Sequence, residues 1–513
     1  MENGQKPTAQ IGIALEVAVF LCGALVMIFE INGSRMLAPF LGTSTYIWTS
    51  LIGVILAALS IGYWVGGRMA DARPSVAVLA SAVFTAGGLV SLTVLIKDVF
   101  LGIISVAGIA LEMKALFAAI VLFAPASVLF GFVLPYAVKL RMQSLSSTGR
   151  TVGRLYALST IGSIAGTFAA GFFLIPFFGS VRTLYLIAGI LFAVSFLLAP
   201  FALKRLNIAA IAVFIAAVAS SELLALYKWQ AARIREIDTE YSRLTIFEST
   251  DPDTGKPIQA LSNDPYFVQS AVFLDSDELV FDYNKFFHLA GILKRKLRHS
   301  LMIGGAGYTF PRDYLKTYPE SRIDVVEIDP RMTKIAHEYF MLEDDPRMSI
   351  FHQDARVYLN NYYGQKYDAV FMDAFGTLFS VPYQLTTVEA MRAIDRILVD
   401  DGILLMNLGS ALKGRASMFL RAELATLRSV FPEVKVFKVK PERQDTELQN
   451  IVIIALKRSR HIAPASVPPL LSELLQQEYY SPIELNLPVL TDEFAPVEHY
   501  NSVALRSLRV TKY

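Results

Sequence analysis

The pattern of apolar and polar residues divides the chain into two halves that differ in kind. Up to about residue 227, apolar stretches of about twenty residues follow one another, with short polar loops between them. This length and composition are typical of membrane-spanning helices. A weaker apolar stretch at 99–111 is a re-entrant segment, an interfacial segment or an eighth short span. We predict seven spans, over residues 11–31, 45–66, 75–96, 115–138, 155–177, 181–203 and 207–227.

The second half shows short runs of strand and helix character. A polar segment at 228–236 leads out of the apolar region, and the runs 244–247 and 271–274 flank a turn-rich stretch, which predicts a small antiparallel β unit. A helix is predicted over 277–296. From Ser300 onward, strands and helices alternate as in a parallel sheet of Rossmann type. The predicted strands are 301–303, 324–327, 348–352, 367–373 and 402–407, the helices 331–339, 388–397 and 417–430, and the final antiparallel pair 434–439 and 450–456.

These patterns predict a multi-domain protein. An all-α transmembrane bundle occupies 1–227, a linker and small β unit 228–292, and a Rossmann-like α/β domain with a C-terminal tail 293–513. The composition agrees, because 54% hydrophobic residues and a mean hydropathy of +0.46 are too apolar for an ordinary soluble chain. The net charge of +2 argues against nucleic acid or another polyanion as partner. The only cysteine, Cys22, lies in an apolar run, so disulfides are not expected.

Basic residues in the loops bear on orientation in the cell (inner) membrane, where we expect a multi-pass protein. Lys and Arg gather at 67–74, 139–154 and 204–206. With seven spans these loops share one side, which the positive-inside rule makes cytoplasmic, and the second half then emerges on the opposite face. A miscounted span would return it to the cytoplasm. We favour the cytoplasm, because the nucleoside ligand inferred below is an intracellular metabolite.

Four features fall at the carboxyl ends of successive predicted strands, where ligands of such sheets bind. A glycine-rich turn follows the first strand, Glu327 ends the second, and Asp354 and Asp373 follow the third and fourth. Glycines allow backbone N–H groups to approach a ligand, and an acid at the end of the second strand suits the two hydroxyls of a ribose. The spacing therefore predicts a nucleoside site.

At these residues the sequence resembles the spermidine synthase (polyamine aminopropyltransferase) family over roughly 237–460, and within it the membrane-fused branch. That family has the class I methyltransferase-like Rossmann fold. The matching motifs are Ile303-Gly304-Gly305, Val326-Glu327-Ile328-Asp329-Pro330, Asp354-Ala355, Tyr367-Asp368 leading to Asp373, and Gly402-Ile403-Leu404. The resemblance implies decarboxylated S-adenosylmethionine as co-substrate, no metal, and a polyamine such as putrescine as acceptor, giving spermidine and methylthioadenosine. It also implies a possible homodimer.

The resemblance also implies roles for individual residues. Glu327 would hold the ribose hydroxyls, Asp354 the adenine amino group, and Asp373 would be the catalytic acid at the reacting centre. Other cofactor-binding positions would be Gly304, Gly305, Gly307 and Ala355. The polyamine pocket would be lined by Gln269, Tyr283, Tyr308, Phe375 and Tyr383.

The sequence departs from the family pattern in ways that keep alternatives open. The acid of the family's glycine loop is replaced by Gly307, and the second acid of its Asp-Ser-Ser-Asp motif is replaced by Gly376. One alternative is a methyltransferase that uses intact S-adenosylmethionine on the same fold. Another is a non-enzymatic membrane protein that binds or transports polyamines, which Glu16 and Glu30 in the first apolar segment favour.

Overall fold

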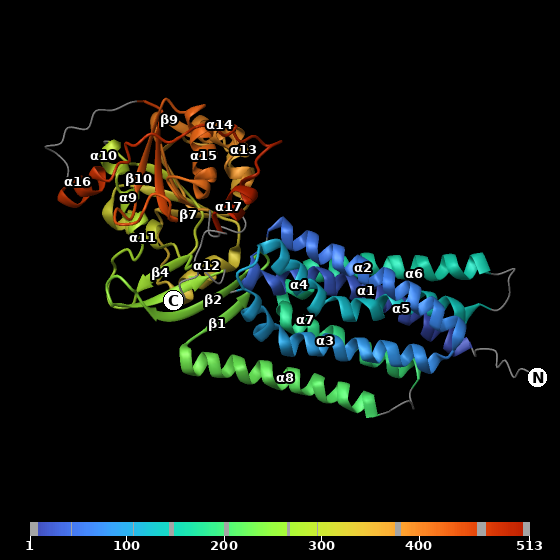
Figure 1. Ribbon diagram of the computed structural model, residues 1–513. Helices are drawn as coiled ribbons and strands as arrows, with labels where there is room; N and C mark the ends of the chain where they lie inside the picture. The colour runs from blue at the N-terminus through green and yellow to red at the C-terminus, as the bar shows by residue number, and fades with distance from the viewer. Residues whose placement is uncertain are drawn as a thin grey trace, which may run out of the picture. The chain divides into compact units, whose positions relative to one another are not determined.

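A computed structural model describes residues 9–505, except 43, 106, 143–147, 200–204, 264–266, 295, 375–380 and 459–467. The chain divides into two compact units, Met1–Leu244 and Thr245–Tyr513 (Figure 1). The division lies close to the predicted change from apolar to alternating sequence. The finer boundaries at 227 and 292 stay predictions.

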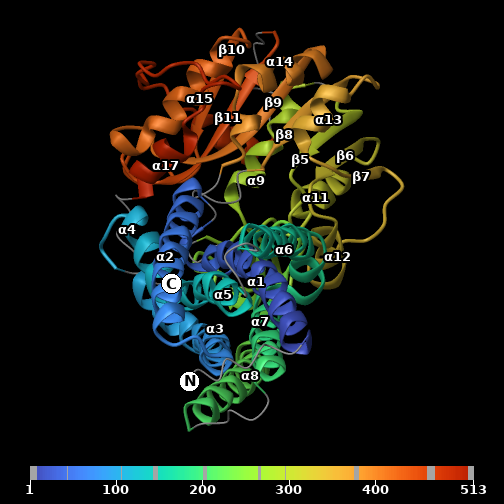
Figure 2. The same ribbon diagram turned by 90° about the vertical axis from the view of Figure 1, so that its right-hand side faces the viewer.

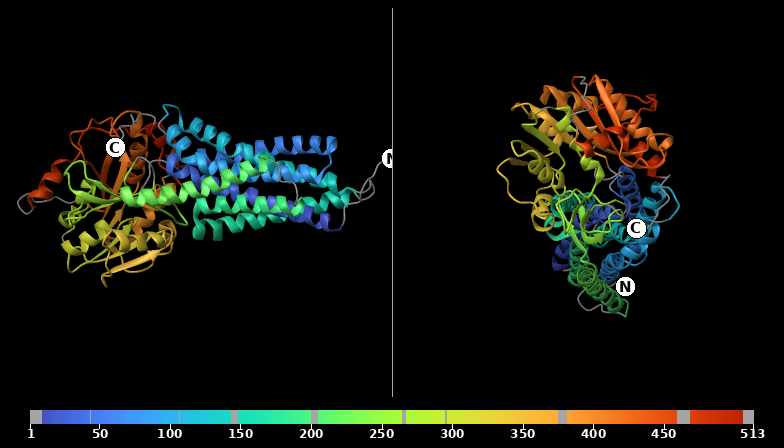
Figure 3. Two further views of the ribbon diagram at one scale, coloured as in Figure 1. Left: turned by 90° about the horizontal axis from the view of Figure 1, so that it is seen from below. Right: turned by 90° about the vertical axis from the view of Figure 1, so that its left-hand side faces the viewer.

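The first unit consists of helices followed by one short strand. The left panel of Figure 3 shows the helices, coloured blue to green, running side by side over much of their length, and Figure 2 shows them from their ends. Their bounds are α1 (Ala9–Leu41), α2 (Thr45–Ala72), α3 (Val76–Ser105), α4 (Leu111–Leu122), α5 (Ala124–Arg141), α6 (Thr148–Ala169), the π-helical turn η2 (Ala170–Leu174), α7 (Ile175–Leu198), α8 (Arg205–Ala232) and the strand β1 (Arg235–Asp238).

Among the described residues of this unit, four helical stretches are long and apolar enough to cross a membrane. They are Ile11–Leu41, Thr45–Ala72, Val76–Ser105 and the continuous run Thr148–Leu198. The pair α4 and α5, bent by 53°, makes a fifth if it counts as one span. Gly179, with φ +77° and ψ 171°, interrupts the longest run near the predicted break between 177 and 181. The number of seven spans stays a prediction.

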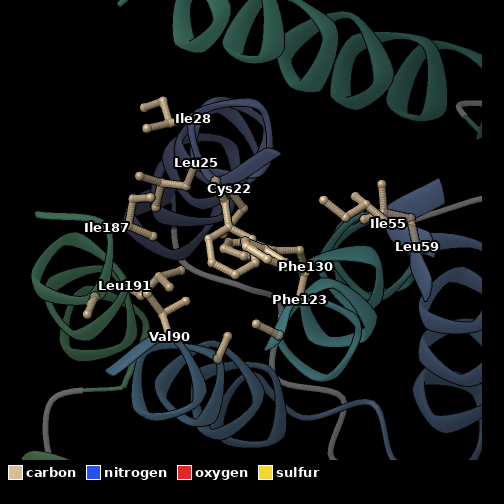
Figure 4. Packing of buried hydrophobic residues seen from close by; sticks show 14 of the residues in the cluster. Cys22, Leu25, Ile28, Ile55, Leu59, Val90, Phe123, Phe130, Ile187 and Leu191 are labelled. Carbon is tan, nitrogen blue, oxygen red and sulfur yellow. The ribbon is translucent and has the colours of Figure 1, made fainter. Parts of the chain in front are cut away.

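The helices of the first unit share one apolar core, part of which Figure 4 shows around Cys22, Leu25 and Phe130. The helices α1 and α6 pack closely, because a Cβ at Gly162 or Gly166 would lie within 2.2 Å of the backbone carbonyl oxygen of a residue on α1. Among the polar residues of α1, Glu16 pairs with Arg154 at 2.8 Å and Arg141 at 3.6 Å. Glu16, which was predicted to be an intramembrane carboxylate, is therefore the ion-pair partner of two arginines near the ends of their helices.

The second unit begins with the small antiparallel sheet. The predicted runs fall in β2 (Arg243–Thr250) and β4 (Ser270–Phe273), and β3 (Pro257–Ser262) pairs with both of them. The sequence analysis missed β3. The predicted helix 277–296 was too long, because among the described residues of this range only α9 (Asp282–Phe287) and α10 (Ala290–Leu293) are helical.

The main sheet has seven strands in the order β10-β11-β9-β8-β5-β6-β7. The strands β7, β6, β5, β8 and β9 are mutually parallel, and β11 runs antiparallel to its neighbours β9 and β10. This is the predicted class I methyltransferase-like Rossmann fold. The strands are β5 (His299–Ile303), β6 (Arg322–Glu327), β7 (Met348–His352), β8 (Tyr367–Met372), β9 (Leu398–Ser410), β10 (Glu433–Lys438) and β11 (Gln449–Leu456).

Helices connect these strands and complete the unit. From β5 the chain proceeds outward to β6 and β7 and then crosses to β8 on the other side of β5, so the switch point of the sheet lies at the end of β5. The helices are α11 (Thr309–Thr317), α12 (Pro330–Tyr339), α13 (Ala355–Asn361), α14 (Val388–Ile397), α15 (Met418–Arg428), α16 (Pro469–Gln476) and α17 (Val497–Leu505), with the 3₁₀ turns η3 (Tyr383–Leu385) and η4 (Arg415–Ser417).

Candidate active site

The glycine-rich turn leaves the end of β5 at the switch point. Gly304 has φ +93°, and a Cβ there would lie 2.5 Å from the backbone carbonyl oxygen of Asp373. A residue with a side chain would therefore be both strained and obstructed. The amide of Asp373 donates to the carbonyl of Ile303 at 2.9 Å. Glycine at this position allows the turn and the end of β8 to lie against each other.

Glu327, at the end of β6, accepts hydrogen bonds from backbone N–H groups of the glycine turn. Its Oε2 accepts the backbone N–H groups of Gly305 at 2.8 Å and Ala306 at 3.2 Å, and its Oε1 accepts the N–H of Asp329 at 2.9 Å. The side chain is buried. Burial raises the pKa of Glu327 above its usual value, and the three backbone donors offset part of that increase. Glu327, the residue predicted to bind the ribose, thus also fixes the conformation of the glycine turn.

The position of the missing loop acid is filled by neighbouring side chains. A Cβ at Gly307 would lie 2.4 Å from Oγ of Ser270 and 3.0 Å from the ring of Phe340. The next residue, Tyr308, has φ +55° and no exposed surface, and its hydroxyl lies 2.7 Å from Oγ1 of Thr333. Tyr308 was predicted to face the polyamine. In this structure its ring packs behind the turn instead.

Asp373 lies at the end of β8 between two hydrogen-bond donors. The hydroxyl of Tyr283 donates to Oδ2 at 2.8 Å, and Nδ2 of Asn407 donates to Oδ1 at 3.0 Å. Burial raises the pKa of the Asp373 carboxyl, and the two donors counteract the increase only in part. Tyr283 is itself buried and stacked on Phe281, with ring centroids 5.7 Å apart. The fold thus brings together two predicted residues that are ninety positions apart.

A small pocket lies between this carboxyl group and the glycine turn. Gln269, Tyr283, Asn284 and Asp373 line it together with residues 304–306. Two buried amide oxygens of this lining, Oε1 of Gln269 and Oδ1 of Asn284, have no hydrogen-bond partner among the described residues. The pocket therefore presents acceptors that its own walls leave unsatisfied.

Asp354 serves as the N-cap of α13. Its Oδ1 accepts the N–H groups of Arg356 at 2.7 Å and Val357 at 3.1 Å, and Ala355 is the first residue of the helix. Arg356 in turn forms an ion pair with Asp492 of the C-terminal tail at 2.6 Å. The capping role uses one oxygen of Asp354 and leaves the other able to accept a further hydrogen bond.

The remaining predicted residues lie elsewhere or outside the described structure. Tyr383 is 50% exposed in η3, and Phe375 falls among residues 375–380, which are not described. The sequence analysis did not select Asn407 or Asn284. Both had a usable signal, because Asn407 ends the predicted fifth strand at the edge that carries the other site residues, and Asn284 follows Tyr283 directly.

Comparison with known proteins finds a family model that covers most of this site. Residues 279–442 match the family model described as the spermine/spermidine synthase domain. The second unit carries a spermine/spermidine synthase domain. This synthase domain contains Glu327, Asp354 and Asp373, and its relatives support the prediction that the chain is a transferase enzyme with polyamine aminopropyltransferase activity.

Two relatives and one solved structure illustrate the similarity. The chain is 28% identical to polyamine aminopropyltransferase of Vibrio vulnificus, over 52% of this chain and 91% of that protein. It is 26% identical to polyamine aminopropyltransferase 1 of Streptomyces coelicolor, over 77% of this chain and 76% of that protein. A probable spermidine synthase from Corynebacterium glutamicum superposes with a TM-score of 0.39 and 23% identity, over 47% of this chain and 86% of that one.

Proposed function

We propose that the protein is a membrane-bound aminopropyltransferase that moves an aminopropyl group from decarboxylated S-adenosylmethionine to a polyamine such as putrescine, giving spermidine and methylthioadenosine. The observation that carries this proposal is the buried Asp373 carboxyl group, held by Tyr283 and Asn407 beside the glycine turn. A carboxylate at this point can receive a proton from an amine that enters the pocket.

The nucleoside part of the donor fits the strand ends described above. Glu327 would accept a ribose hydroxyl, and the free oxygen of Asp354 would accept the adenine amino group, with Ala355 beside it. Gly304, Gly305 and Gly307 would form the turn against which the donor lies. Because these groups recognise a nucleoside rather than its sulfonium substituent, they suit decarboxylated and intact S-adenosylmethionine alike.

The transfer itself requires a neutral amine. The acceptor arrives as an ammonium ion and gives one proton to Asp373, whose raised pKa favours this step. The amine lone pair then attacks the carbon next to the sulfonium, the carbon–sulfur bond breaks, and its electron pair returns to sulfur as the thioether of methylthioadenosine. Gln269 and Tyr283 would line the path of the amine. Proposed acceptor contacts by Phe375 and Tyr383 remain predictions.

The first unit would anchor the enzyme. Its four apolar helices support a multi-pass membrane domain. We place the synthase domain on the cytoplasmic side, because its proposed substrates are intracellular, and we expect a homodimer. A reporter fused after Tyr513 tests the side: activity of a cytoplasm-specific reporter supports the assignment, and activity of a reporter that works only outside the cytoplasm overturns it.

The activity test uses the purified full-length chain. It is incubated with putrescine, spermidine or cadaverine and with either decarboxylated or intact S-adenosylmethionine, and the nucleoside products are separated. Methylthioadenosine from the decarboxylated donor, lost in Asp373→Asn and retained in the exposed control Asp344→Asn, supports the proposal. S-adenosylhomocysteine from the intact donor would identify a methyltransferase instead. If neither product forms, the remaining alternative is a non-enzymatic protein that binds or transports polyamines.

A further inference from the structure

Two arginines share one carboxylate at the end of the first unit where α1 and α6 begin. Glu16 of α1 forms ion pairs with Arg154 of α6 at 2.8 Å and with Arg141, the last residue of α5, at 3.6 Å. The guanidinium group of Arg141 lies against α1 at Gly12, where a Cβ would be only 1.9 Å from its Nη1 atom. One negative charge therefore faces two positive charges, and one positive charge is left over.

Most N–H groups of these two guanidinium groups are not used by the protein. An arginine side chain has five N–H donors and no acceptor. Within the described residues, Arg154 donates one hydrogen bond, to Glu16, and Arg141 donates none, because 3.6 Å is too long for a hydrogen bond. Yet the side chain of Arg141 is only 27% exposed. Partly buried donors of this kind suit a phosphate group, whose oxygens guanidinium groups bind in pairs.

The same end of the unit carries further positive charge. Lys139, in the last turn of α5, pairs at 2.6 Å with Asp71, in the last turn of α2. Arg68 and Arg150 have no carboxylate partner in the part of the chain that the structure describes. Arg68 instead lies over the ring of Trp64, 5.7 Å from its centroid, and Trp64 is 67% exposed. Exposed tryptophan rings and basic residues near the ends of apolar helices are typical of the headgroup level of a membrane.

We propose that Arg141 and Arg154 bind the phosphate of an anionic phospholipid, and that Glu16 holds their guanidinium groups side by side for it. This inference rests on the membrane location in the proposed function and adds a lipid site in the first unit. A lipid is favoured over soluble phosphate because Glu16 lies in the second turn of the apolar stretch Ile11–Leu41, and headgroup phosphates lie near the ends of such stretches. The charge of Glu16 opposes that of the phosphate and therefore limits the affinity.

Native mass spectrometry of the full chain in a non-ionic detergent measures this binding without turnover. The probes are phosphatidylglycerol, phosphatidylcholine and inorganic phosphate. We expect phosphatidylglycerol to bind about tenfold more tightly than phosphatidylcholine, and Arg141→Gln and Arg154→Gln each to weaken it about fivefold, the usual contribution of one basic side chain near anionic lipid. Arg141→Lys should lose less. The matched control is Arg182→Gln, which should change nothing: Arg182 is exposed and lies at the other end of the unit, near the hydrogen bond of 2.9 Å between Asn32 and Ser180.

The variant Glu16→Gln provides the decisive readout, because it removes the competing charge and keeps the shape of the side chain. Phosphatidylglycerol should then bind about fivefold more tightly. Arginines that only neutralise Glu16 would leave the affinity unchanged, which would overturn the inference. The double variant Glu16→Gln/Arg141→Gln leaves no carboxylate without its partner, so it should fold and return the affinity to about that of the unchanged protein.

Two other results would also contradict a lipid site. Equal affinity for phosphatidylcholine would show that the charge of the headgroup is not recognised, and displacement of phosphatidylglycerol by millimolar inorganic phosphate would identify a site for a soluble anion. Failure of the proposed function shows separately. Loss of the activity appears as absence of methylthioadenosine from every amine, and loss of the membrane anchor appears as a chain that stays in solution without detergent.

Discussion

Replacement of Asp373 by asparagine should affect stability and activity in opposite directions. Burial raises the pKa of this carboxyl group above the value of about 3.9 for an aspartate in an unfolded chain. The folded state therefore disfavours the charged form, and the ionised carboxylate destabilises the second unit at neutral pH. The substitution removes that charge and leaves a side chain of the same shape.

The surrounding hydrogen bonds can adapt to the new amide. Its oxygen can accept from the hydroxyl of Tyr283, and its NH₂ group can donate to Oδ1 of Asn407, which has no partner among the described residues, once the Asn407 amide turns over. The number of hydrogen bonds stays the same, with Nδ2 of Asn407 taking the unpaired place that its Oδ1 has now. We expect a gain of about 0.5–2 kcal/mol in the free energy of unfolding at pH 8, as when a destabilised functional site is relaxed. This corresponds to about 1–8 °C in the midpoint of thermal unfolding.

The pH dependence of stability tests independently whether Asp373→Asn raises the free energy of unfolding. As pH falls towards the pKa of the unfolded carboxyl group, both states of the unchanged protein become protonated, and the advantage of Asp373→Asn should disappear. Scanning calorimetry at pH 8 and near pH 4 measures this, with Asp344→Asn as control. Activity at pH 8 should fall about 10²- to 10⁴-fold, because the proton acceptor is gone. A variant that is less stable at pH 8, or whose advantage is equal at both pH values, would refute the reasoning.

Three further predictions concern the turn and the pocket. Gly307→Asp, which restores the family's loop acid, should lower stability by about 1–3 kcal/mol in calorimetry, because Ser270 and Phe340 fill the space; an unchanged midpoint contradicts this. Glu327→Gln should weaken methylthioadenosine binding about tenfold or more in titration, because an amide has one accepting oxygen for three backbone donors; equal affinity contradicts it. Butylamine should react with a kcat/KM within about tenfold of putrescine, because Asp373 is the only carboxyl group in the described pocket lining; a hundredfold preference for putrescine would show a second anionic contact.

The strands and the acids at their ends were predictable because both follow from local pattern. Apolar runs that end in glycine or an acid recur along 300–373, and the structure puts Glu327 and Asp373 at the ends of β6 and β8. The strand β3 was missed because Pro257 and the polar Gln259 interrupt its apolar pattern. Its place in the sheet depends on pairing with β2 and β4 on both sides, which no local window contains.

Side-chain direction was the less predictable part of the site. Tyr308 lies in the turn, as the sequence requires, but its left-handed backbone conformation directs the ring behind the turn towards Thr333. The contact between Asn407 and Asp373 depends on β8 and β9 being adjacent and in register, with Met372 opposite Met406. Strand order can be inferred from alternation, whereas register and rotamer follow only from the packed structure.

The hydrogen bonds of Glu327 also set a condition on how fast a nucleoside can bind. A carboxylate offers about four lone-pair positions, and three of them are occupied by the N–H groups of Gly305, Ala306 and Asp329. A ribose presents two neighbouring hydroxyls, so accepting both requires one backbone N–H to give way. Association should therefore include a rearrangement of the turn and proceed more slowly than diffusion allows. Deuterium exchange at the amides of Gly305 and Ala306 would report this motion directly.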